Sequence, residues 1–128
     1  MIKGIGTDIV EVGRMERECR RHGDGFLARI FCSAEVDYCE GKRRRFESYA
    51  ARFAAKEAFL KALGADGGEG ISWLDIEVVL DEGGRPGLAL HGRAHEVARE
   101  RGVAGVFVSL SHSGDIATAV AVLEGNDE

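Results

Sequence analysis

The chain has 128 residues, of which 45% are hydrophobic and 30% are charged. This length suits one domain around a single core, and the composition is typical of a soluble globular protein, which excludes a disordered chain and a membrane-embedded one. Its 17 basic and 22 acidic residues give a formal net charge of −5, which by itself disfavours nucleic acid or another polyanion as the ligand.

The three cysteines, Cys19, Cys32 and Cys39, cannot all pair within one chain, and none has the CxxC spacing of a zinc or redox site. The N-terminus runs directly into a strand-like pattern without the charged and apolar regions of a signal peptide. No apolar run approaches the roughly 20 residues of a membrane span. We therefore expect reduced thiols and a cytoplasmic protein, with residues 1–128 forming a single domain.

Hydrophobic periodicity and turn residues divide the chain into helices and strands. In order, we expect a strand over 2–12, a short helix over 14–21 broken at 22–25, a short helix capped by Ser33, a long helix over 44–63 closed by Gly64, strands over 74–80 and 87–90, a helix over 93–101, and strands over 106–112 and 116–123. Because helices and strands do not alternate strictly, the expected fold is α+β.

Asp8 interrupts the first predicted strand, where aspartate is disfavoured. By strand alternation Gly4, Gly6 and Asp8 face the same side, so the glycines leave room for a bulky group to approach the backbone beside the carboxylate. A bulged or edge strand with a solvated Asp8 explains the same residues equally well. The two glycines are not a dinucleotide fingerprint, because Ile9 occupies the place of the third glycine.

Glu57 lies on the long helix only about 40° from the apolar stripe that includes Phe53. One interpretation is a surface pair with Lys61, four residues later, worth a few tenths of a kcal/mol. The other joins Glu57 to Asp8 as two oxygen ligands of Mg²⁺, an ion that commonly takes one or two carboxylates and completes its shell with water and substrate phosphates.

Cations that can bind phosphate gather on the same predicted helix, although each alone is more typical of a solvated surface. They are Arg44, Arg45, Arg52, Lys56 and Lys61. His112 ends the segment Ser109-Leu110-Ser111-His112 at the mouth of the last hairpin. Such a cluster suits a phosphate or an adenine, but a histidine at a strand end is often only a satisfied polar residue.

The motifs Gly6-Thr7-Asp8 and Arg52-Phe53-Ala54-Ala55-Lys56-Glu57-Ala58-Phe59-Leu60-Lys61-Ala62 resemble those of the 4′-phosphopantetheinyl transferase superfamily, specifically its short bacterial holo-acyl-carrier-protein synthases. The resemblance extends over nearly the whole chain, through Arg14, Phe26, Arg29, Gly84-Arg85-Pro86 and Val108-Ser109-Leu110-Ser111-His112-Ser113. It implies an antiparallel sheet with a long helix packed against it, and a homotrimer with active sites between subunits.

The resemblance also implies an activity: Mg²⁺-dependent transfer of the phosphopantetheine arm of coenzyme A to a serine of apo-acyl carrier protein. Asp8 and Glu57 would hold the metal, Lys61 would neutralise the leaving phosphate, and either Glu57 or a metal-bound water would take the serine proton. The implied coenzyme A contacts are Arg45, Arg52, Lys61, Gly64, Pro86 and His112. A non-catalytic coenzyme A or carrier-binding module of the same fold is the alternative.

Acyl carrier proteins are acidic, and the family binds them through a basic first helix. Arg14, Arg17 and Arg21 share one helical stripe, which Phe26 and Arg29 extend, while Glu18 interrupts it. Residues 1–64 hold 13 basic and 10 acidic side chains, a net charge of +3, whereas residues 65–128 hold 4 and 12, a net charge of −8. The half with the candidate site therefore suits anionic partners, with no nucleic acid or membrane expected among them.

Overall fold

The structure is a computed structural model that describes residues 1–65 and 68–126. Its elements, in chain order, are β1 (Ile2–Glu11), α1 (Val12–His22), α2 (Asp24–Ile30), α3 (Ser33–Glu40), α4 (Arg45–Leu63), the 3-10 helix η1 (Trp73–Asp75), β2 (Ile76–Leu80), β3 (Pro86–Leu90), α5 (Gly92–Glu100), β4 (Val103–Ser113) and β5 (Ile116–Gly125). This order confirms the expected α+β fold.

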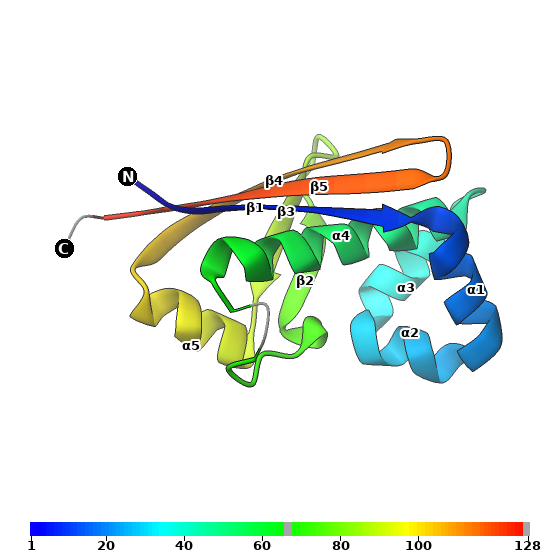
Figure 1. Ribbon diagram of the computed structural model, residues 1–128, viewed down its shortest axis with the longest axis horizontal. Helices are drawn as coiled ribbons and strands as arrows, with labels where there is room; N and C mark the ends of the chain where they lie inside the picture. Colours follow the sequence, from blue (N-terminus) through cyan, green and yellow to red (C-terminus); the bar gives the residue numbers. More distant parts are fainter. Residues whose placement is uncertain (66–67, 127–128) are drawn as a thin grey trace.

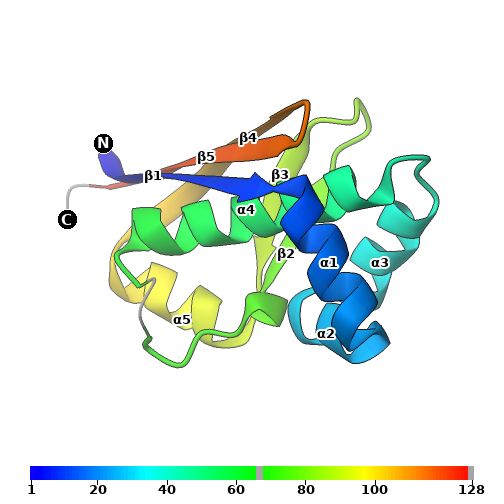
Figure 2. The same cartoon turned by 45° about the vertical axis from the view of Figure 1, so that its right-hand side comes forward.

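Two antiparallel sheets frame the long helix α4. The larger has the strand order β1-β5-β4, and the smaller is the β2-β3 hairpin. Helix α4 runs along one face of the larger sheet, as expected, and helices α1 to α3 gather at one end of it (Figure 1). In the turned view the β2-β3 hairpin runs crosswise to α4 (Figure 2). Helix α4 is therefore covered on several sides.

The strand β1 packs against α4 with almost no side chain between the two backbones. A Cβ atom added to Gly4 would lie 1.9 Å from the carbonyl oxygen of Ala62, and one added to Gly6 would lie 2.1 Å from that of Ala58. The bulky group for which these glycines leave room is thus the protein's own helix. Asp8, next on the same face of β1, is thereby placed beside α4.

Two cationic residues of α4 are buried because the helix is covered on several sides. Ala50, Ala54, Ala55 and Ala58 pack without exposed surface, which small side chains allow. Arg52 and Lys56 are buried as well, so the interpretation of these two residues as solvated surface is wrong. The physical reason is that α3 and β2 pack against α4, and that the Trp73 carbonyl of η1 lies within hydrogen-bond distance of the Lys56 ammonium.

Several predicted boundaries differ from the structure. The break expected over 22–25 is confined to Gly23, whose φ of 69° ends α1, and helix α2 then begins at once. Ser33 is the first residue of α3, and Cys32 stands at the N-cap position instead. The strand expected from residue 106 begins at Val103, because its pairing with β5 extends to Gly125.

The cysteines carry free thiols, as expected, and Cys19 and Cys39 are buried. Burial raises the pKa of each of these two thiols to about 11. Because the thiolate is the reactive form, these side chains are inert packing groups at neutral pH. Among the described residues, no helix combines the length and the apolar character that crossing a membrane requires.

The contact between β1 and α4 predicts that Gly6→Ala is strongly destabilising. The added methyl group meets helix backbone and not a flexible side chain, so the two elements must separate. We expect a loss of at least about 2 kcal/mol in the free energy of unfolding, measured by urea denaturation. Gly25→Ala is the matched control, because its Cβ meets nothing within 4 Å and alanine favours a helix by up to about 1 kcal/mol. Equal stabilities of the two variants would contradict the close contact.

Candidate functional site

A groove with a volume of about 940 Å³ opens between β1, α1, α2, α4 and η1. Its lining combines acidic, basic and aromatic side chains from segments that lie far apart in the sequence. They include Asp8, Glu57, Arg14, Glu18, Arg29, Phe26, Phe53 and Trp73. The two carboxylates singled out as metal ligands therefore face the same space.

Asp8 is held by a cation from α4. The Nζ atom of Lys61 donates a hydrogen bond to Oδ1 of Asp8 over 2.9 Å, and the Asp8 side chain is 15% exposed. Lys61, at 44% exposure, also borders a shallow depression beside Thr7 and Ser111. The link between β1 and α4 thus keeps a positive charge next to the first carboxylate.

Glu57 is held by a different kind of partner. The indole Nε1 of Trp73 donates a hydrogen bond to Oε2 of Glu57 over 2.8 Å. The Trp73 ring packs edge-on against Phe53, with ring centroids 5.6 Å apart. Sequence reasoning missed Trp73, because an aromatic residue before a strand is typical of ordinary packing.

The residues present fit a hard divalent cation bound together with a phosphate-bearing substrate. Carboxylate oxygens are the ligands that such ions prefer, and Mg²⁺ is usually held by one or two of them. No group of three or more His, Cys, Asp or Glu side chains with metal-binding geometry occurs within residues 1–65 and 68–126. Asp8 and Glu57 thus suit a site that substrate oxygens and water complete.

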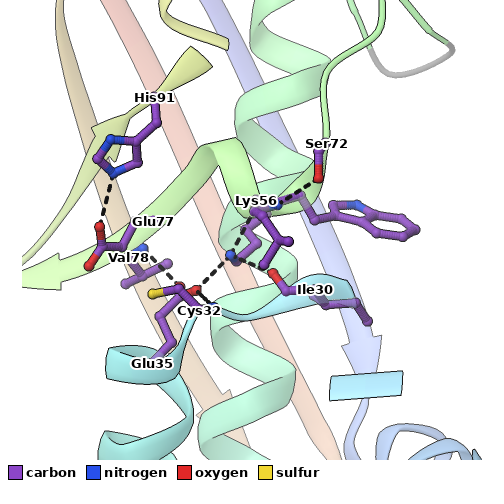
Figure 3. Close-up of polar contacts among 10 residues, drawn as sticks. Ile30, Cys32, Glu35, Lys56, Ser72, Glu77, Val78 and His91 are labelled. Carbon is purple, nitrogen blue, oxygen red and sulfur yellow. Dashed lines mark hydrogen bonds and ion pairs between the residues drawn. The ribbon is translucent and has the colours of Figure 1, made fainter. Parts of the chain in front are cut away.

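Lys56, next to Glu57 in sequence, points into the protein (Figure 3). Its Nζ atom donates hydrogen bonds to Oε1 of Glu35 and to the carbonyl of Ile30, both over 2.8 Å, and to the carbonyl of Trp73 over 3.0 Å. The Val78 N–H donates to the other Glu35 oxygen over 2.9 Å. Burial lowers the pKa of Lys56, and the Glu35 carboxylate opposes that shift. Lys56 therefore joins segments of the fold and is not a phosphate ligand.

A second, basic depression of about 320 Å³ lies near the start of α4. Its lining includes Arg52 and His112 from the sequence-based prediction, together with Tyr38, Lys42, Arg43 and Arg44. The Arg52 guanidinium lies 4.0 Å from the centroid of the Tyr38 ring, and its buried Nε has no hydrogen-bond partner among the described residues. Glu47 also lines the depression and lies 3.0 Å from Arg44, but the basic side chains outnumber it, and the remaining positive charge suits a phosphate group.

The remaining predicted coenzyme A contacts lie elsewhere. Arg45 lies at the start of α4, with its guanidinium 4.6 Å from the centroid of the Phe46 ring. Gly64 ends the same helix in the left-handed conformation, with φ of 76°, as predicted from its role in closing the helix. Pro86 begins β3, opposite Leu80. One copy of the chain thus does not bring all six predicted contacts together.

The predicted docking residues meet the groove only in part. Arg14, Phe26 and Arg29 line it, whereas Arg17 and Arg21 lie exposed on α1 outside its lining. None of these arginines forms a salt bridge with a described residue, which leaves their charges available to a partner. The start of α1 is held by the turn between β4 and β5, because Oδ1 of Asp115 in that turn accepts a hydrogen bond from the Gly13 N–H over 2.9 Å.

Comparison with known proteins gives consistent matches. The family model of the 4′-phosphopantetheinyl transferase superfamily matches residues 4–121. The holo-[acyl-carrier-protein] synthase of Geobacter sp. (strain M21) is 48% identical over 124 residues, which cover 97% of this chain and 99% of that protein. The one from Desulforudis audaxviator is 49% identical over 128 residues, covering 100% and 97%.

Solved structures agree with the sequence matches. The holo-ACP-synthase of Plasmodium yoelii superposes with a TM-score of 0.85 at 32% identity, covering 99% of this chain and 98% of that one. The Helicobacter pylori holo-[acyl-carrier-protein] synthase in complex with coenzyme A superposes with a TM-score of 0.83 at 32% identity, covering 94% of this chain and 99% of that one. The chain therefore belongs to the 4′-phosphopantetheinyl transferase superfamily, in its holo-[acyl-carrier-protein] synthase branch.

Proposed function

We propose that this chain transfers the 4′-phosphopantetheine arm of coenzyme A to a serine hydroxyl of apo-acyl carrier protein and releases adenosine 3′,5′-bisphosphate. The observation that carries the proposal is the shared groove, where Asp8 and Glu57 stand beside Arg14 and Arg29. A metal-binding pair and docking cations in one space suit a reaction between a diphosphate and an acidic protein. The names of the relatives and the coenzyme A complex of the H. pylori protein support the same assignment.

In this proposal Asp8 and Glu57 hold Mg²⁺. When bound, the ion would neutralise charge on the diphosphate and polarise the attacked phosphorus. Lys61, held beside Asp8, adds a positive charge that stabilises the departing bisphosphate. Phe26, Phe53 and Trp73 add apolar surface to the groove that holds the charged groups.

The transfer balances as a displacement at phosphorus. The serine oxygen forms a bond to the phosphorus that carries the pantetheine arm, and the bond from that phosphorus to the bridging oxygen breaks. Adenosine 3′,5′-bisphosphate leaves with the electron pair of that bond. The serine proton passes to a base of the site, for which Glu57 is the candidate among the residues of this chain.

The carrier protein is proposed to dock along α1 and α2. Arg14, Arg29 and the apolar Phe26 line the groove, and Arg17 and Arg21 continue the positive charge along α1. Positive charge around an apolar contact suits an acidic helix-bearing partner and steers its approach. A carrier docked there would present its serine to the groove that Asp8 and Glu57 line.

We further propose a homotrimer in which each active site lies between two copies. The face of the larger sheet turned away from α4 exposes large apolar side chains: Ile5 at 61%, Ile9 at 65% and Phe107 at 58%. A second copy would remove this surface from water. In addition, Arg45 and Gly64 stand at opposite ends of α4, about 28 Å apart for a helix of this length. Two copies side by side can unite the groove of one with the basic depression of the other; the number three is implied by the family.

Free thiols at all three cysteines are consistent with a reducing compartment, and we propose a cytoplasmic location. Residues 1–128 are proposed to act as one transferase domain, whose partners are coenzyme A, acyl carrier protein and further copies of the chain. The alternative of a non-catalytic coenzyme A or carrier-binding module is disfavoured, because Asp8 and Glu57 line one groove and Lys61 is hydrogen-bonded to Asp8.

The transferase assignment predicts that Glu57→Gln lowers the transfer rate by at least about 100-fold, because the neutral amide binds a divalent ion poorly while filling the same volume. The measurement is mass spectrometry of an apo carrier incubated with coenzyme A and Mg²⁺. Glu96→Gln on α5, which removes an exposed carboxylate paired with Arg93, is the matched control and keeps the wild-type rate. Full activity of Glu57→Gln would remove Glu57 from the metal site, and coenzyme A binding without transfer to any of several carriers would favour the non-catalytic module.

The shared-site proposal predicts complementation between two inactive variants. Glu57→Gln damages the groove, and the double variant Arg52→Ala with His112→Ala damages the basic depression. After the two are unfolded and refolded together, random assembly restores on the order of a quarter of the wild-type sites. A mixture that stays inactive although both variants assemble normally would show that each copy builds its site alone.

The proposed trimer is tested separately by light scattering of the unmodified chain. The measured mass should correspond to three chains per particle, and a mass of one or two chains would contradict the trimer.

A further inference from the structure

Trp73 forms hydrogen bonds to two consecutive residues of α4, one through its main-chain carbonyl and one through its indole N–H. Its carbonyl accepts a hydrogen bond from the buried Lys56 ammonium over 3.0 Å, and its indole N–H donates to Glu57 over 2.8 Å. Lys56 is fixed in turn by Glu35, with which it forms a fully buried ion pair. The backbone of Trp73 is therefore anchored in the protein interior, while its ring reaches the groove.

The short helix η1 that carries Trp73 is secured at both ends. The Ser72 hydroxyl accepts a hydrogen bond from the Leu74 N–H, and the Asp75 carboxylate accepts one from the Ser72 N–H, both over 3.1 Å. The Asp75 carbonyl accepts a further bond from the His91 N–H over 2.8 Å. A donor mounted on so constrained a turn holds its direction without help from the ligand.

The chemistry of the indole group suits the task of holding a metal ligand. It offers one donor and no acceptor, so it occupies one oxygen of Glu57 and leaves the lone pairs of the other available. It is also uncharged, so it orients the carboxylate without neutralising it. Asp8 differs in this respect, because its partner is the Lys61 ammonium. Within the described part of the chain Glu57 thus forms no salt bridge, so no paired ammonium offsets its charge as Lys61 offsets that of Asp8.

We propose that Trp73 is a positioning residue, which fixes the Glu57 carboxylate through its indole N–H and thereby sets the affinity of the site for the divalent ion. The inference rests on the proposed role of Glu57 as a metal ligand and adds a residue that acts through it. Hydrogen-bond partners of metal ligands typically change metal affinity by 10- to 100-fold when they are removed. The packing of the ring against Phe53 is a separate role, and a phenylalanine at position 73 would keep it.

The test compares Trp73→Phe, Leu74→Ala and Glu57→Gln with the unmodified full chain in the presence of coenzyme A. Affinity for Mn²⁺ is measured from the electron paramagnetic resonance signal of the free ion, after subtraction of binding to coenzyme A alone. We expect Trp73→Phe to weaken Mn²⁺ binding about tenfold. Its transfer rate should fall at low Mg²⁺ and recover as Mg²⁺ is raised. Leu74→Ala changes a side chain of the same turn but leaves the indole hydrogen bond to Glu57 in place, and should bind Mn²⁺ as the unmodified chain does.

The outcomes separate this inference from the proposed function. If Glu57→Gln abolishes Mn²⁺ binding while Trp73→Phe binds normally, the positioning role is wrong and the ligand assignment stands. If Glu57→Gln still binds Mn²⁺, the ligand assignment itself is wrong. A rate of Trp73→Phe that stays low at all Mg²⁺ concentrations would also overturn the positioning role.

A second measurement needs no variant at position 73. Trp73 is the only tryptophan of the chain, so tryptophan fluorescence reports on the surroundings of this one indole. Because a cation at Glu57 alters the electric field at the indole, Mg²⁺ should produce a saturable change of emission in the unmodified chain and none in Glu57→Gln. If Mg²⁺ leaves the emission of the unmodified chain unchanged, the coupling of Trp73 to the metal site is wrong.

Discussion

The close approach of β1 to α4 is the contact on which the candidate site depends. Gly4 and Gly6 remove the side chains that would separate the two backbones, and α4 lies directly against them. Asp8 follows two residues later on the same face of the strand. Its ion pair with Lys61 therefore connects residues that are 53 positions apart in sequence. Without this contact, an acid in a strand and an acid on a helix would not line one groove.

A second constraint acts on the other side of α4. The buried pair of Lys56 and Glu35 ties α4 to α3 and, through main-chain groups, to η1 and β2. Removing one partner from such a pair leaves an uncompensated buried charge, which costs several kcal/mol. Lys56 and Glu57 are consecutive residues of α4 with different surroundings. The Lys56 side chain is buried and stabilises the fold, whereas the Glu57 side chain lines the groove. The same helix thus both organises the core and presents the carboxylate.

Sequence patterns predicted the features that depend on residues close together in the chain. Asp8 and Glu57 could be found because each acid interrupts an apolar pattern, and the closure of the long helix at Gly64 followed from a glycine's access to positive φ. The burial of Lys56 could not be found, since it depends on three segments that pack over α4. Trp73 was missed for a similar reason, because its bond to Glu57 exists only after η1 and α4 have packed together.

Asp8 and Glu57, brought together by the contact of β1 with α4, are proposed to hold one divalent ion. The most direct measurement is a crystal structure of the chain with coenzyme A and Mn²⁺, with data collected so that the anomalous scattering of manganese locates the ion. The account predicts a single strong anomalous peak between the two carboxylates, within coordination distance of both and of the diphosphate. A peak that the diphosphate holds alone, or one placed beside other side chains, would contradict it.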